Sequence, residues 1–113
     1  MQSLTQIYCK FFLFYVLCWR TLQAVHKATR AAQFKVDASY DKPQHNTLLA
    51  CDCEVLVSEL RQTVGPPDSM QYPENTLWGG HNVPHDRYTN DMAQTAYTIA
   101  KNIVENCEKF ISN

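Results

Sequence analysis

A chain of 113 residues is long enough for one helical domain with a core of its own, with little stability to spare. Hydrophobic residues make up 45%, which excludes a chain disordered by composition, and three glycines are few for a β-rich fold. Ten basic residues against eleven acidic ones exclude the dominant basic face of most nucleic-acid binders, so no nucleic-acid partner is expected.

The first twenty residues contain a strongly apolar run, residues 11–19, between Lys10 and Arg20. The run is too short to cross a bilayer, which takes about 20 residues. Three interpretations stay open: the apolar region of a signal peptide, burial in a helix, or an atypical gene start joined to a normal domain. Residues 1–20 are therefore kept apart from the expected bundle domain, residues 21–113.

Helical periodicity extends over residues 3–33. An apolar stripe predicts that this helix buries one face, and it comprises Leu22, Val25, Ala28 or Thr29, and Ala32. Residues 36–45 predict a linker, with Pro43 as the helix breaker.

The most regular pattern lies in residues 48–64. Apolar side chains recur there at helical spacing, on Leu49, Cys53, Leu56, Leu60 and Val64. They predict one amphipathic helix, with Asn46 or Thr47 as its N-cap. A glycine and two prolines at residues 65–67 end this helix. A stripe of this kind must be buried against other helices.

Residues 65–88 predict a long loop, because they hold four of the five prolines and all three glycines. Within it, Leu77 and Trp78 are candidates to dock on the bundle or to reach a partner. His81 and His85 flank a proline and lack helical geometry, so we interpret them as a chance pair and expect no metal site.

The last helix is expected from Asp91 to Phe110, with Asn90 as its N-cap. Its stripe is the clearest in the chain and is interpreted as core; it comprises Met92, Ala96, Ile99, Ile103, Cys107 and Phe110.

The five cysteines show no zinc-ligand spacing, and Cys51 and Cys53, two apart on a predicted helix, should point in different directions. We interpret the cysteines as reduced thiols, some packing as small apolar residues. No phosphate loop, nucleophile elbow or metalloprotease motif is present. The sequence therefore predicts no enzyme and no cofactor.

Three short segments, in the same order, resemble the C-terminal domain of the GIT family of Arf GTPase-activating adaptors. Residues 48–64 resemble its third helix, residues 94–101 its fourth, and residues 30–33 the end of its first. The resemblance implies an all-α, up-down, four-helix bundle like the focal-adhesion-targeting domain. Only a short linker separates Gln33 from Asn46, so one helix of the four is expected to be missing or replaced, with the N-terminal apolar run as a candidate substitute.

The resemblance also implies a function. Such a domain is an adaptor or scaffold that binds short leucine- and aspartate-rich helices of the paxillin type, in adhesion and Arf/Rac-linked signalling in the cytoplasm. A groove between the first and fourth helices would take the partner helix. The expected contacts are basic and apolar side chains, namely Lys27, Arg30 and Lys101 with Val25, Ile99 and Ile103.

Other interpretations stay open. An uncovered apolar groove on a three-helix remnant would allow a homodimer. A small secreted helical protein would lose a signal peptide near Ala24 and form a disulfide among Cys51, Cys53 and Cys107, although an odd cysteine count disfavours it. A small enzyme has no acid, base or nucleophile constellation to support it.

Overall fold

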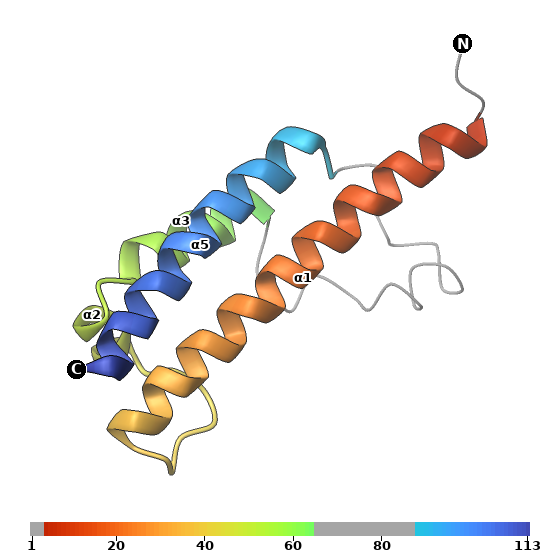
Figure 1. The fold of residues 1–113 in the computed structure, drawn as a ribbon. Helices are drawn as coiled ribbons and strands as arrows, with labels where there is room; N and C mark the ends of the chain where they lie inside the picture. The colour runs from red at the N-terminus through yellow and green to blue at the C-terminus, as the bar shows by residue number, and fades with distance from the viewer. Residues whose placement is uncertain (1–3, 65–87) are drawn as a thin grey trace.

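A computed structural model of the chain describes residues 4–64 and 88–113, with side chains from Leu13 onwards. These residues form four helices: α1 (Leu4–Val36), α2 (His45–Ala50), α3 (Glu54–Val64) and α5 (Asn90–Ser112) (Figure 1). The described residues contain no strand, so the prediction of an all-α bundle is confirmed. None of the described helices is long and apolar enough to cross a membrane.

The predicted loop lies almost entirely outside the described residues. Leu77, Trp78, His81 and His85 belong to residues 65–87, which are not described. Tyr88, the next residue along the chain, is buried and packs edge-on against the Tyr15 ring, with 5.2 Å between ring centroids.

Helix α1 is one continuous helix across the apolar run and the stripe that follows it. The run does not replace a missing helix, because it forms the N-terminal half of α1 itself. Tyr15, Cys18 and Leu22 from this half are buried in the core. Cleavage near Ala24 would remove all three from the bundle.

The single helix predicted for residues 48–64 is two helices, because the chain turns at residues 51–53. Asp52 adopts a left-handed conformation, with φ of 58°, which aspartate tolerates better than most residues. Its carbonyl accepts a hydrogen bond from Asn106 Nδ2 at 3.1 Å. The break removes Leu49 from the predicted stripe and leaves it 47% exposed, while Cys53, Leu60 and Val64 are buried as expected.

Helix α5 begins one residue earlier than predicted, and its N-cap is Thr89 in place of Asn90. The Thr89 hydroxyl accepts a hydrogen bond from the Met92 amide at 3.2 Å. The predicted stripe is otherwise confirmed, since Ala96, Ile99, Ile103 and Cys107 are buried, and Met92 and Phe110 are partly buried against the core.

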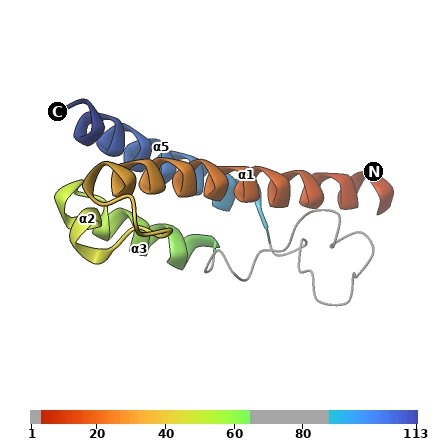
Figure 2. The same cartoon turned by 90° about the horizontal axis from the view of Figure 1, so that it is seen from below.

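The three long helices alternate in direction, with α1 and α5 parallel and α3 antiparallel to both (Figure 1). Helix α5 packs along both α1 and α3. In Figure 2, α3 lies below α1, and the N-terminal part of α5 overlaps α1. Lys35 ties the ends of α1 and α5 together, because its Nζ donates to the carbonyl oxygens of Phe110 at 2.7 Å and Ile111 at 3.1 Å. A cation at a helix C-terminus also stabilises the helix dipole.

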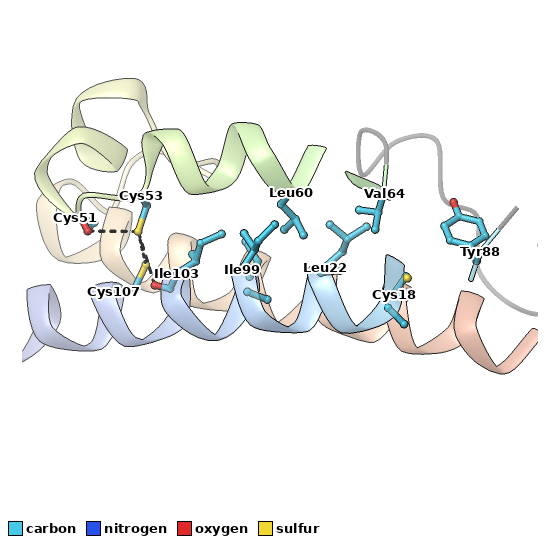
Figure 3. Close-up of a cluster of buried hydrophobic side chains, with 14 of the residues drawn as sticks. Cys18, Leu22, Cys51, Cys53, Leu60, Val64, Tyr88, Ile99, Ile103 and Cys107 are labelled. Carbon is cyan, nitrogen blue, oxygen red and sulfur yellow. Dashed lines mark hydrogen bonds between the residues drawn. The ribbon is translucent and has the colours of Figure 1, made fainter. Parts of the chain in front are cut away.

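The core lies where the three helices meet, and Figure 3 shows Leu22, Leu60, Val64, Ile99 and Ile103 converging there. Ile103 is fully buried, and burying a side chain of its size stabilises the fold by about 1.5–3 kcal/mol. The buried side chains hold the helices in place and leave grooves between them on the surface.

Candidate functional site

The turn at residues 51–53 brings cysteine side chains together. Cys53 Sγ lies 3.8 Å from Cys107 Sγ and 3.4 Å from the Cys51 carbonyl oxygen (Figure 3). This stretch is a turn and not part of one helix, so the spacing argument for Cys51 and Cys53 pointing apart does not apply: both are buried, and Cys53 Sγ lies against Cys107 Sγ. Cys18, Cys51, Cys53 and Cys107 are all free.

These thiols are poor nucleophiles. Burial raises the pKa of Cys18 to about 11 and raises the pKa values of Cys51, Cys53 and Cys107, so the reactive thiolate is disfavoured. Among the described residues, no group of three or more His, Cys, Asp or Glu side chains is placed to hold a metal ion. The cluster packs as small apolar side chains, as the sequence predicted for the cysteines.

A groove of about 560 Å³ runs between α1 and α3. Its floor is apolar and comes from both helices, with Leu22 and Val25 on α1 and Val57 and Leu60 on α3. We call it the α1–α3 groove. Its volume is within the range of about 300–1,000 Å³ that is usual for ligand-binding clefts.

The rim of the α1–α3 groove is mainly basic. Arg30 rises from α1, Arg61 from α3 and Lys42 from the loop that closes one end, and all three are exposed. Asp41 is the one acidic side chain among the described residues that line it. The groove therefore combines an apolar floor with a surplus of positive charge at its edges.

A buried hydrogen-bond network fixes the end of this groove. Gln33 is only 1% exposed, and its Oε1 accepts from the Gln44 amide at 2.8 Å and from the Thr47 hydroxyl at 2.6 Å. These bonds tie α1 to the start of α2. They hold the loop that carries Lys42 and Pro43, because Gln44 is the residue at which this loop ends.

A second groove lies between α1 and α5, in two adjoining hollows of about 490 and 390 Å³ that share Leu17, Thr21 and Tyr97. We call it the α1–α5 groove. Its charges are mixed, with Arg20 and Lys101 beside Glu105 and Glu108. It lacks the positive surplus of the α1–α3 groove.

The six predicted contact residues do not gather in one place. Val25 and Arg30 line the α1–α3 groove, and Lys101 lines the α1–α5 groove. Ile99 and Ile103 line neither, because they are buried in the core at 9% and 0% exposure. Lys27 is exposed on α1 and is in neither lining.

Sequence reasoning missed the contribution of α3 to a groove. Val57, Leu60 and Arg61 supply one wall, and Lys42 and Pro43 the end. The apolar stripe of residues 48–64 contained this signal, since Arg61 directly follows the stripe residue Leu60. Comparison with protein-family models, with curated proteins and with solved structures found no match to this chain.

Proposed function

We propose that this chain is an adaptor domain that holds a short acidic, amphipathic helix in the α1–α3 groove. The observation that supports this is the pairing of an apolar floor with a rim on which Arg30, Lys42 and Arg61 outnumber Asp41. A partner helix inserts its apolar face between α1 and α3, and its flanking carboxylates meet the basic rim.

The dimensions of the groove set the length of the partner. Helix α3 has 11 residues, which at 1.5 Å per residue is roughly 16 Å, or three turns. A partner of about three to four turns therefore contacts the whole wall. A leucine- and aspartate-rich helix of the paxillin type is short, amphipathic and acidic, so the proposal keeps the partner class that the family resemblance implies. It likewise keeps the cytoplasmic signalling or adhesion context as part of the proposal.

The affinity should be modest, because a single short helix must give up conformational freedom on binding. A micromolar Kd corresponds to about −8 kcal/mol. Charges on an exposed rim add to the association rate and the salt dependence more than to the affinity. Binding should therefore weaken as ionic strength rises.

The experiment is a fluorescence-anisotropy titration of the full chain with a labelled leucine- and aspartate-rich peptide of the paxillin type. The control peptide has each aspartate replaced by lysine. Micromolar binding of the acidic peptide and none of the basic one is the expected result. A folded protein that ignores both peptides would refute the proposed function.

Charge-reversal variants locate the site. Arg30→Glu and Arg61→Glu should each weaken binding by about fivefold to tenfold, or roughly 1–1.4 kcal/mol. Lys101→Glu is the matched control, because Lys101 is an exposed cation in the other groove. Weakening by Lys101→Glu alone would place the peptide in the α1–α5 groove, the location that the family resemblance implies, and would overturn the assignment to α1–α3.

A further inference from the structure

The outer face of α5 carries a second stripe, separate from its core stripe. It comprises Tyr97, Lys101, Val104, Glu108 and Ile111, which recur at spacings of 4, 3, 4 and 3. This is the heptad spacing of a coiled-coil seam, where one helix packs lengthwise on another. We call these five residues the α5 seam.

The α5 seam is uncovered in the described structure. Tyr97 is 62% exposed and Ile111 39%, while Val104 is partly exposed. Leu17 of α1 borders the seam across the α1–α5 groove and is 45% exposed. Large apolar side chains at regular seam positions are unusual on a helix face that meets only water.

Lys101 and Glu108, the two charges of the seam, form no salt bridge among the described residues. The salt bridge found there joins His45 to Glu54, near the start of α2 and α3. The two charges lie on either side of Val104, three residues before it and four residues after it. A cation and an anion placed around a central apolar residue make a self-complementary surface.

We propose that the α5 seam packs antiparallel against the same seam of a second copy of this chain. With a two-fold axis at Val104, each Val104 meets its counterpart. Each Lys101 then faces Glu108 of the other copy, and each Tyr97 faces the other Ile111. The same surface patch thus serves both copies, which is the arrangement of a closed two-fold dimer.

The dimer is independent of the proposed helix binding, because Arg30 and Arg61 line the α1–α3 groove, whereas the seam lies on the far face of α5. Five seam residues per copy make a small interface, below the roughly 1,200 Å² of total buried area that is usual for stable complexes. We therefore expect a reversible dimer with a micromolar Kd, and two helix-binding grooves per dimer.

The test uses sedimentation velocity on two full-length variants, Lys101→Glu and Glu108→Lys, alone and mixed. Each variant alone places like charges opposite each other on both sides of Val104, so each should be largely monomeric at concentrations where the wild type is dimeric. In an equimolar mixture, residue 101 of one copy and residue 108 of the other again carry opposite charges on both sides of Val104. Association should therefore return, which general loss of folding cannot produce.

Apolar contacts are tested with Tyr97→Arg, which should weaken self-association at least tenfold. Val55→Arg is its matched control, since Val55 is similarly exposed at 67% but lies on α3. Circular dichroism confirms that each variant is helical. A wild type that stays monomeric at about 100 μM, where a micromolar Kd requires dimer, would overturn the proposal. So would a mixture that does not associate, or a dimer that Tyr97→Arg leaves intact.

Discussion

Replacing Gln33 with leucine tests whether the buried network between α1 and α2 stabilises the fold. The Gln33 carboxamide oxygen accepts two hydrogen bonds at 1% exposure, from the Gln44 amide and the Thr47 hydroxyl. Each such bond contributes about 1 kcal/mol, and a buried donor left without a partner costs a further 1–3 kcal/mol. We expect Gln33→Leu to lower the free energy of unfolding by about 2–4 kcal/mol, a large part of the usual 5–15 kcal/mol.

The measurement is urea unfolding followed by circular dichroism at 222 nm. A double-mutant cycle with Thr47→Val isolates one of the two bonds, because valine keeps the shape of threonine without its hydroxyl. The single change Thr47→Val should cost about 1 kcal/mol, and the two changes together should cost less than their sum. The two effects should not add, because each single variant already breaks the same hydrogen bond, the one from the Thr47 hydroxyl to Gln33 Oε1.

The network also connects stability to binding, because it positions the loop that carries Lys42 at the end of the α1–α3 groove. Gln33→Leu should therefore weaken the binding of the acidic peptide even under conditions where the protein is folded. A Gln33→Leu protein whose free energy of unfolding is within about 0.5 kcal/mol of wild type, and whose effect adds to that of Thr47→Val, would contradict this expectation. It would mean that these groups are not held together in solution.

Four further outcomes follow. Ile103→Ala should cost about 2–5 kcal/mol in the same unfolding assay, because the side chain is fully buried; a cost below 1 kcal/mol would show that the core is open at this point. Thr89→Ala should cost about 1 kcal/mol through loss of the α5 N-cap, and Thr89→Asp, which keeps a capping acceptor, should restore it. Asp52→Val should destabilise the turn before α3, whereas Asp52→Gly should be tolerated, because φ is positive there; equal effects in thermal melts would contradict this. Burial raises the pKa of the Cys18 thiol from 9.0 to about 11, so the thiol of the unfolded chain loses its proton at lower pH than the thiol of the folded chain. The free energy of unfolding, and with it the Tm, should therefore fall as pH rises from about 9 to 11. In Cys18→Ala, the Tm should fall less over this pH range.

The fold class could be predicted from the sequence because helical periodicity records which face is buried. The stripe of α5 was placed correctly from Met92 to Phe110, and so was the stripe of α1. Helix ends were less exact, since Thr89 and Asn90 are both good capping residues and only the backbone conformation distinguishes them.

The break between α2 and α3 could not be predicted, because it depends on a tertiary contact. Apolar residues continue at helical spacing through Cys53, so local preference favours one helix. The left-handed Asp52 is held by a hydrogen bond from Asn106, which is 54 residues away along the chain. Sequence spacing contains no record of that bond.

The candidate site was predicted only in part for a related reason. The basic residues were expected on the first and last helices, and Arg30 does line the α1–α3 groove. Ile99 and Ile103 were expected to be accessible, but they lie in the core where α5 meets α3. Periodicity shows that a face is apolar; it does not show which neighbouring helix covers that face.

A partner helix between α1 and α3 is the proposal on which the function depends, and one titration distinguishes this groove from the other. The acidic leucine-rich peptide is titrated into the wild type, Arg61→Glu and Lys101→Glu under identical conditions. We expect micromolar binding that Arg61→Glu weakens and Lys101→Glu does not change. Binding that only Lys101→Glu weakens, or no binding by a folded wild type, would contradict it.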